Sequence, residues 1–475
     1  MDSEGKIAKF LSDKREDLIA DLQTLISFSS IQGEPEEDKP FGLEVDRCLK
    51  AFLQRAQEME MRTENLEGYA GTVEIGNGDE MLGILCHLDV VPAGNDWDYD
   101  PFTGVIDEGK IYGRGTLDNK GPAIASLYAM KAILDLDISL NKRVRLILGT
   151  NEESGWEGIS YYQDNYEMPD IAFSPDAVYP VIHAEKGILI FDLSFAKTMD
   201  SEVEKEEKEV LVKKLTGGNA PNMVPDRASA LVEGNYNYLQ QEIDQYEKNY
   251  DGEIQLKKIN ETEGEIIFKG ISAHGSLPQD GINAISYLID FLAGLELQNN
   301  DMASFICSYE NLIGKQYFAE NIGCQMEDEV SGKLVFNVGQ IVTKENEVRI
   351  TVNIRYPVTY QAEEVYNGME DKIKKVDWQL FKKEHKKPLY VEKEDILVKD
   401  LMEVYKEVTG DEDAKPIAIG GGTYARAVPK GVAFGPLFPG QPELAHQKNE
   451  FIEIKDLLLN TEILFKAIIK LAGKK

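Results

Sequence analysis

The run MLGILC, residues 81–86, is matched further along the chain by a second short apolar run, VRLILG, residues 144–149. A continuous apolar run of this length is typical of a strand buried on both faces of a sheet. Between the two runs, GPAIASLYAMKAILDL (121–136) carries apolar residues at helical spacing. Strand, helix and strand in succession predict an α/β fold with parallel strands and helices on the faces of the sheet.

The middle of the chain has a different pattern. GEIIFKGISAHGS (264–276) and NEVRITVNIRYPV (346–358) alternate as strands do, and a helical segment lies at 281–295. Further helices are expected at 5–27, 42–59, 394–408 and 453–472. We therefore expect a discontinuous α/β domain, residues 1–186 and 384–475, with a mixed, mainly parallel sheet and helices on both faces. A smaller α+β domain at 187–383 is expected to interrupt it.

Composition excludes several classes of partner. The net charge of −33 over 475 residues disfavours nucleic acid and anionic membrane surfaces, because both would repel the chain. The charged N-terminus does not resemble a signal peptide, and apolar runs of 18 residues are lacking. The four cysteines lie far apart without a CxxC pair, which favours reduced thiols and a cytoplasmic location.

Two polar residues follow the first apolar run directly. His87 and Asp89 are two positions apart, so on an extended strand their side chains point the same way, and Asp89 can orient the imidazole of His87. Asp118 stands just before a glycine-opened helix. The alternatives are a structural histidine at the end of a buried strand and an ordinary helix cap at Asp118.

Further candidate ligands occur later in the chain. Glu152 and Glu153 follow the second apolar run, and because neighbouring side chains face opposite ways we expect one to bind a metal and the other to move protons. Asp176 follows another short strand, and His446 lies near the chain end. Two histidines with several carboxylates suit zinc better than calcium or magnesium.

Together these motifs resemble the M20 family of metallopeptidases, and most closely its PepV-like and carnosinase-like dipeptidase branch. The motifs that carry the resemblance occur in family order from about residue 85 to 450: HLDVVPAG (87–94), GRGTLDNKGP (113–122), NEESG (151–155), SPDAVYP (174–180), AEKG (184–187), GGNAPNMVP (217–225), SAHGSLP (272–278), NIRYP (353–357), GGTYAR (421–426) and PELAHQKNE (442–450). The chain has Asn119 where many relatives have a second aspartate.

The resemblance implies a site for two zinc ions, with manganese or cobalt as alternatives. His87 and Asp176 would bind one ion, Glu153 and His446 would bind the other, and Asp118 would bridge the two ions. The peptide bond after Asp118, which joins it to Asn119, would be cis. Asp89 would orient His87, and Glu152 would act as general base on a water shared by the two ions.

The resemblance also assigns substrate contacts. His274 would stabilise the oxyanion, and the substrate would be held by Arg355, Asn222 and the glycine loop with Gly421 and Thr423. Without the family, His274 would be read as a turn residue and Arg355 as a surface arginine of a strand. Because these residues lie mostly on the inserted domain, the resemblance implies a lid that closes on the substrate.

We therefore expect a metal-dependent dipeptidase that cleaves small peptides with a free amino terminus, and a monomer because the lid is long. The main alternative is an N-acyl or N-succinyl amino acid amidohydrolase with the same two-metal site. A non-catalytic binding protein is a further alternative, which the intact Glu152 disfavours.

Overall fold

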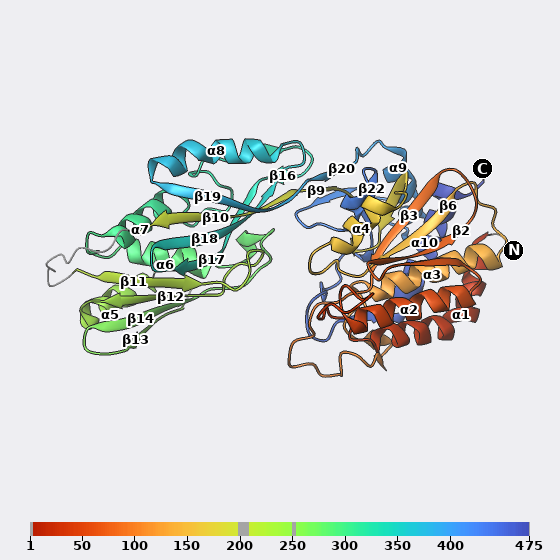
Figure 1. Cartoon of the computed structure of the whole chain (residues 1–475), viewed down its shortest axis with the longest axis horizontal. Coiled ribbons are helices and arrows are strands. Elements are labelled where there is room, and N and C mark those ends of the chain that lie inside the picture. Colours follow the sequence, from red (N-terminus) through yellow and green to blue (C-terminus); the bar gives the residue numbers. More distant parts are fainter. Residues whose placement is uncertain (1–2, 198–208, 249–252, 475) are drawn as a thin grey trace. The chain divides into compact units, whose positions relative to one another are not determined.

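The computed structural model describes residues 3–197, 209–248 and 253–474. The chain divides into two compact units, which Figure 1 shows with their helices and strands labelled. Unit 1 consists of residues 1–184, 389–418 and 422–475, and unit 2 of residues 185–388 and 419–421. Each unit has a sheet and a hydrophobic core of its own.

The sheet of unit 1 has parallel strands at its centre and antiparallel strands outside them. Its strand order is β1 (Arg62–Leu66), β2 (Ala70–Ile75), β6 (Arg143–Gly149), β3 (Met81–His87), β7 (Ile171–Ser174), β22 (Gly431–Phe434), β9 (Val181–Glu185) and β20 (Leu389–Tyr390), with β21 (Ile417–Ile419) paired to β9. Strands β6, β3, β7 and β22 run parallel, whereas β2 and β9 pair antiparallel with their neighbours. The expected mixed, mainly parallel sheet is confirmed.

Both faces of this sheet are buried, as the apolar run at 81–86 predicts. Ile84 and Cys86 belong to the core under one set of helices, and Leu85 belongs to the core under the other. The first set is α1 (Ser3–Ile26), α2 (Leu43–Glu58), α3 (Lys120–Asp135), α9 (Ile396–Thr409) and α10 (Ile454–Ala472). The second set is α4 (Glu157–Asn165) and the short helix η2 (Tyr424–Ala427).

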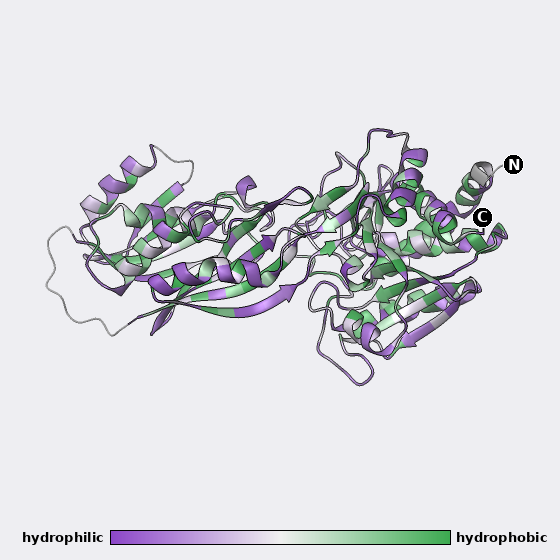
Figure 2. Ribbon diagram, turned by 90° about the horizontal axis from the view of Figure 1, so that it is seen from above, coloured by the Kyte–Doolittle hydropathy of each residue, from purple (hydrophilic) through white to green (hydrophobic). Residues whose placement is uncertain are grey.

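Two small sheets complete unit 1. One contains β4 (Val105–Asp107), β5 (Lys110–Tyr112) and β24 (Phe451–Glu453), and the other pairs β8 (Ala177–Val178) with β23 (Pro436–Leu437). The helices expected in this part of the chain are confirmed to within three residues at each end. Figure 2 shows hydrophobic and hydrophilic residues alternating along the helices, as expected for helices with one buried side.

Unit 2 is built on an antiparallel sheet of eight strands. Their order is β13 (Glu253–Lys258), β14 (Glu263–Lys269), β12 (Arg227–Glu233), β11 (Leu211–Gly217), β17 (Val335–Thr343), β18 (Glu347–Tyr356), β10 (Gly187–Ala196) and β19 (Trp378–Lys386). Its helices are α5 (Tyr236–Tyr246), α6 (Ala284–Ala293), α7 (Asp301–Leu312) and α8 (Ala362–Lys375). The remaining elements are η1 (Pro278–Asp280), β15 (Glu327–Asp328) and β16 (Gly332–Lys333).

The two faces of β18 differ in polarity. Val348, Ile350, Val352 and Ile354 belong to the core that the helices of unit 2 cover. The alternate residues, including Asn353 and Arg355, therefore lie on the opposite face of the sheet. In the part of the chain that the structure describes, we find no helix with the length and apolarity needed to cross a membrane.

Candidate active site

The carboxyl ends of three parallel strands bring the predicted ligands of unit 1 together. His87 is the last residue of β3, and it lies beside Gly149, the last residue of β6. Glu152 and Glu153 follow β6 closely, and Asp176 follows β7. Parallel strands end at one edge of the sheet, so loops that are distant in sequence meet there.

Asp118 lies at the centre of this cluster. One of its oxygens, Oδ1, is 2.8 Å from Nε2 of His87, and the other, Oδ2, is 3.0 Å from Nε2 of His446. Each histidine has a second carboxylate beside it. Nε2 of His87 is 3.5 Å from Oδ1 of Asp176, and Nε2 of His446 is 3.0 Å from Oε1 of Glu153. The peptide bond between Asp118 and Asn119 is cis, as expected.

The donor set of this cluster fits a divalent cation. One ligand atom each of His87, Asp118 and Glu153 lies within 4.8 Å of the others. Nδ1 of His87 is 2.9 Å from the backbone oxygen of Asp89, which can only accept, so the ring proton resides on Nδ1. Nε2 is therefore the nitrogen that faces Asp118 and Asp176, and it is the one that could bind a metal once its own proton is lost, as in a metal-ligating histidine.

The electrostatics of the cluster point the same way. Burial alone would lower the pKa of His87, but the carboxylates of Asp176 and Asp118 outweigh it and hold that pKa well above its ordinary value. Burial and the neighbouring charge of Asp118 raise the pKa of Glu153 to about 7. Burial also raises the pKa of Glu152 well above its usual range. The cluster therefore has more negative charge than its two imidazoles balance, and a bound cation would relieve it.

Asp89 and Asn119 position their neighbours through contacts that the sequence does not reveal. The carboxylate of Asp89 accepts the backbone N–H groups of Glu152 (3.0 Å) and Glu153 (2.9 Å), and its Oδ1 is 3.5 Å from Nδ1 of His87. The side-chain amide of Asn119 donates to Oδ1 of Asp176 at 2.7 Å. Asp89 thus holds the loop that carries both glutamates.

A buried ion pair joins the two loops that carry Asp118 and His446. Oε1 of Glu450 accepts the backbone N–H groups of Gly115 (3.0 Å), Leu117 (2.8 Å) and Asp118 (3.3 Å). Its Oε2 accepts from Nη1 of Arg114 at 2.6 Å, and both side chains are at most 1% exposed. Sequence reasoning assigned no role to Glu450 or Arg114, although both lie inside quoted motifs.

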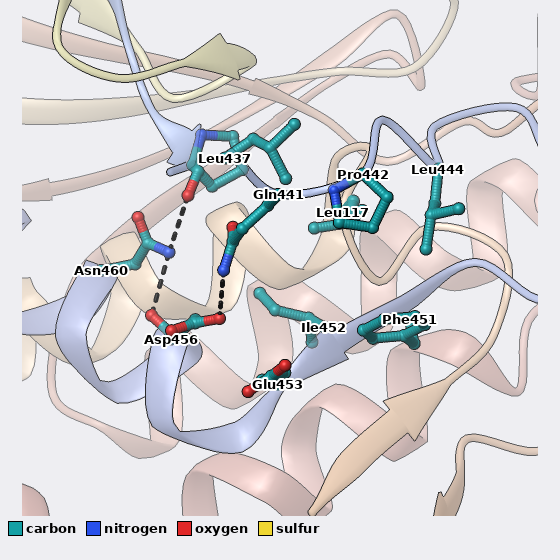
Figure 3. Close-up of a pocket in the computed structure, with 11 residues that line it drawn as sticks. Leu117, Leu437, Gln441, Pro442, Leu444, Phe451, Ile452, Glu453, Asp456 and Asn460 are labelled. Atoms are coloured by element: carbon teal, nitrogen blue, oxygen red, sulfur yellow. Dashed lines mark hydrogen bonds between the residues drawn. The ribbon is translucent and has the colours of Figure 1, made fainter. Parts of the chain in front are cut away.

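A small cavity lies beside the same two loops (Figure 3). Leu117 and Leu444, each one or two residues ahead of a predicted ligand, line it together with Asp456. Its volume of about 40 Å³ has room for water but not for a dipeptide. Nε2 of Gln441 donates to Oδ2 of Asp456 at 2.7 Å across one side of it. The cavity is therefore too small to be the substrate site.

Unit 2 gathers the predicted substrate contacts on the polar face of its sheet. Nη1 of Arg355 donates to the backbone oxygen of Gly420 at 2.9 Å. A Cβ atom at Gly420 would lie 2.7 Å from Cβ of Ser276. The glycine therefore permits its loop to approach the loop that carries Ser276. The loop with His274 therefore lies next to Gly420, the residue that Arg355 contacts.

The tautomer of His274 is fixed by Ser276. Nδ1 of His274 is 2.6 Å from Oγ of Ser276 and accepts the backbone N–H of Ser276 at 3.3 Å. Because Nδ1 accepts, the ring proton of the neutral histidine resides on Nε2. The exposed His274 is therefore prepared to donate a hydrogen bond from Nε2.

The loop that carries Asn222 closes the cluster of unit 2. The backbone oxygen of Asn222 accepts from the N–H of Gly275 at 2.7 Å, beside His274. Nδ2 of Asn337, on β17, donates to the backbone oxygens of Pro221 (3.1 Å) and Met223 (2.9 Å). Asn222, His274 and Arg355 are thus linked by a continuous set of contacts, which we call the donor cluster.

The two remaining predicted contacts lie in the glycine loop. Gly421 belongs to unit 2, one residue after the Gly420 that Arg355 contacts. Thr423 belongs to unit 1, is 3% exposed, and its Oγ1 accepts from the backbone N–H of Ala425 at 3.2 Å, which caps η2. A role of either residue in substrate binding stays a prediction.

Comparison with known proteins gives relatives along nearly the whole chain. Residues 83–470 match the family described as "Peptidase family M20/M25/M40". A Bacillus subtilis protein named "Putative dipeptidase YtjP" is 39% identical over 464 residues, which cover 97% of this chain and 98% of that protein. A Staphylococcus saprophyticus protein named "Putative dipeptidase SSP1012" is 37% identical, with 96% and 97% covered.

Solved structures share the fold at lower identity. Aminoacylhistidine dipeptidase from Vibrio alginolyticus superposes with a TM-score of 0.58 at 16% identity, covering 96% of this chain and 97% of that one. Human carnosine dipeptidase 1 gives a TM-score of 0.57 at 15% identity, with 98% of each chain covered. The match to the family and the two close relatives leave one conclusion: the chain belongs to the M20/M25/M40 family of peptidases.

Proposed function

We propose that this peptidase is a metal-dependent dipeptidase that hydrolyses the peptide bond of dipeptides with a free amino terminus. The observation that carries the proposal is the environment of Asp118. Its two oxygens face two different histidines, at 2.8 and 3.0 Å, and each histidine has a further carboxylate beside it. Two half-sites that share one carboxylate suit a pair of divalent ions. The named dipeptidases among the relatives support the substrate class.

The ion ligands follow from these neighbours. We assign His87 and Asp176 to one ion, His446 and Glu153 to the other, and Asp118 to both. Imidazole and carboxylate donors favour zinc, with manganese or cobalt as alternatives. When bound, such ions supply Lewis acidity that polarises the scissile carbonyl and lowers the pKa of a water.

Glu152 is the proposed general base. It follows β6 directly, its backbone is fixed by Asp89 at 3.0 Å, and burial raises the pKa of its carboxyl. A carboxyl with a raised pKa can accept a proton from the attacking water and return it to the leaving amine near neutral pH. Asp89 supports this role by holding the Glu152 backbone, and it orients His87 through its own backbone oxygen.

The donor cluster of unit 2 is proposed to bind the rest of the substrate. His274, with its proton on Nε2, would donate to the oxyanion that forms at the scissile carbon. The guanidinium of Arg355 would bind the substrate carboxylate, with further contacts from Asn222, Gly421 and Thr423.

Two further properties are part of the proposal. We propose a monomer, because unit 2 comprises residues 185–388 and supplies His274, Asn222 and Arg355 from the same chain. We propose a cytoplasmic location, because all four cysteines are free thiols and three of them are buried.

The test uses substrate pairs that differ at one group. Each pair has the same C-terminal residue after the scissile bond, preceded by either a free amino acid or an N-acyl amino acid. Metal-free protein and protein loaded with zinc or manganese are assayed in parallel. We expect cleavage of the free-amine member only, and only by loaded protein.

Other outcomes would replace the proposal. Cleavage of the acylated member would assign the chain to the amidohydrolases with the same ion site. Failure on both members by protein with two bound ions would favour a binding protein. Cleavage by protein shown to be free of metal would overturn the mechanism.

A further inference from the structure

Asn353 is a buried residue beside the donor cluster, and it has no role so far. It lies on β18, two residues before Arg355 and on the same face of the sheet, and it is fully buried. Across the sheet it pairs with Asn337, which holds the Asn222 loop. Asn353 is therefore enclosed between the Arg355 side of the cluster and the Asn222 side.

The orientation of the Asn353 amide is determined by its neighbour. Nε of Arg355 donates to Oδ1 of Asn353 at 2.8 Å. A guanidinium has only donors, so the oxygen of the amide must face it, and a flipped amide would set two donors against each other. Nδ2 of Asn353 consequently points away from Arg355 Nε.

That nitrogen is unsatisfied. Nδ2 of Asn353 is buried and has no hydrogen-bond partner among the residues that the structure describes. Buried amide donors in folded proteins almost always have a partner, because leaving one unmade is costly. In contrast, the corresponding amide nitrogen of its neighbour, Nδ2 of Asn337, donates to two backbone oxygens. Nδ2 of Asn353 thus needs an acceptor that the described residues do not supply.

We infer that Nδ2 of Asn353 donates to the carboxylate of the substrate, next to the guanidinium of Arg355. This inference rests on the proposed function and deepens it, since it makes the site selective for a free carboxylate. A carboxylate has two oxygens that only accept. Arg355 and Asn353 can therefore serve it together, whereas the NH₂ group of a C-terminal carboxamide would meet donors.

The deciding variant is Asn353→Asp. An aspartate keeps an oxygen for Nε of Arg355 but replaces the amide donor with an acceptor. Because the added charge of this variant would also repel a substrate carboxylate, a role limited to orienting Arg355 predicts that an uncharged variant without the amide keeps the wild-type preference. A role as donor predicts that kcat/KM for a free dipeptide falls about 10- to 100-fold, the usual effect of losing one hydrogen bond to a charged group.

The measurement compares each dipeptide with its C-terminal carboxamide in the ion-loaded enzyme. We expect the wild type to prefer the free acid and Asn353→Asp to lose about tenfold or more of that preference. Asn353→Ser, which removes the amide without a change of charge, should shift the preference in the same direction. Asn237→Asp, an exposed position of the same unit, controls for an added negative charge.

A second readout needs no turnover. Calorimetry measures binding of the free C-terminal amino acid and of its amide to wild type and both variants. If the wild type cleaves neither member of the pair, the proposed function fails, and the binding ratio still decides the role of Asn353. An acid-to-amide ratio that stays the same in folded Asn353→Asp and Asn353→Ser, by either readout, would overturn the inference.

Discussion

The two clusters of this chain are opposites in chemistry. In unit 1, five carboxylates surround two histidines, and the shared Asp118 has a ring nitrogen at each oxygen. In unit 2, the corresponding groups are donors, namely a guanidinium, an imidazole N–H and an amide with an unsatisfied nitrogen. Both clusters lie on the polar edge or face of a sheet whose other surfaces are buried.

This difference indicates which kind of ligand would stabilise each cluster. A group of buried acceptors is stabilised by cations, and a group of buried donors is stabilised by an anion or a carbonyl oxygen. A dipeptide has one group of each kind, because its scissile carbonyl requires an electrophile and its carboxylate requires donors. Changes that affect one cluster should therefore have signatures distinct from changes that affect the other.

The largest effect is expected at Glu152. Glu152→Ala removes the proposed base and none of the proposed ligands, so kcat should fall by about 10²- to 10⁴-fold while bound ion is retained. Product formation in assays quenched at fixed times gives kcat, and elemental analysis of the same preparation gives the ion content. Loss of the ions together with activity would mean that the tasks of Glu152 and Glu153 are assigned wrongly.

A change in unit 2 should leave the ions alone. Arg355→Ala should lower kcat/KM for free dipeptides by about 100-fold, since a charge-assisted contact to the carboxylate is lost. Ion content should equal that of the wild type. Arg349→Ala is the matched control, because Arg349 lies on the same strand and face but contacts Asp192. Equal kcat/KM in wild type and Arg355→Ala would remove Arg355 from the site.

A substitution at Glu450 tests whether ion binding depends on the side chain that holds the Asp118 loop. Glu450→Gln replaces one acceptor oxygen with an NH₂ group, which weakens the hold on the Asp118 loop, and leaves the buried Arg114 without a charged partner, so ion affinity should fall about 10- to 100-fold. Competition with a chelator measures that affinity. Glu453→Gln, three residues further and partly exposed, should bind ions as the wild type does. Unchanged affinity in folded Glu450→Gln would contradict a positioning role.

The smallest effect is a pH dependence confined to unit 1. The pKa of Glu153 is raised to about 7, so this ligand is protonated below that pH and must lose its proton when an ion binds. Because Glu153 adds one proton to be displaced below pH 7, ion affinity should fall more steeply below that pH than above it, by about a further tenfold per pH unit. Titrations in buffers of different ionisation enthalpy would detect the released proton. Affinity that stays constant from pH 8 to 5.5 would contradict it.

The sequence predicts those parts of the molecule that depend on local patterns. The apolar run at 81–86 specifies a strand buried on both faces, and His87 at its end follows from where that run stops. The helix at 453–472 is recognisable from its 3.6-residue spacing, because it buries one broad apolar side, whereas the helix at 121–136 is recognisable as a long apolar segment and is buried on nearly all sides. The family motifs then point to the ligand residues one by one.

Contacts between distant residues are not visible in such patterns. Glu450 reaches the backbone of Gly115 across 335 positions, and nothing in its local sequence distinguishes it from a surface glutamate. The unsatisfied Nδ2 of Asn353 is likewise invisible in the sequence, because it follows from the hydrogen bond by which Arg355 orients the Asn353 amide. Asn119 could be found as a departure from the family motif, but its hydrogen bond to Asp176 required the fold.

The count of bound ions tests the central claim most directly. Metal-free protein is titrated with zinc by calorimetry, and the ions retained after gel filtration are counted by elemental analysis, for wild type and Asp118→Asn. Because the two oxygens of Asp118 face two different histidines, we predict two ions per wild-type chain and at most one in the variant. A wild-type chain that retains one ion or none, or a variant that retains two, would contradict the shared-carboxylate site.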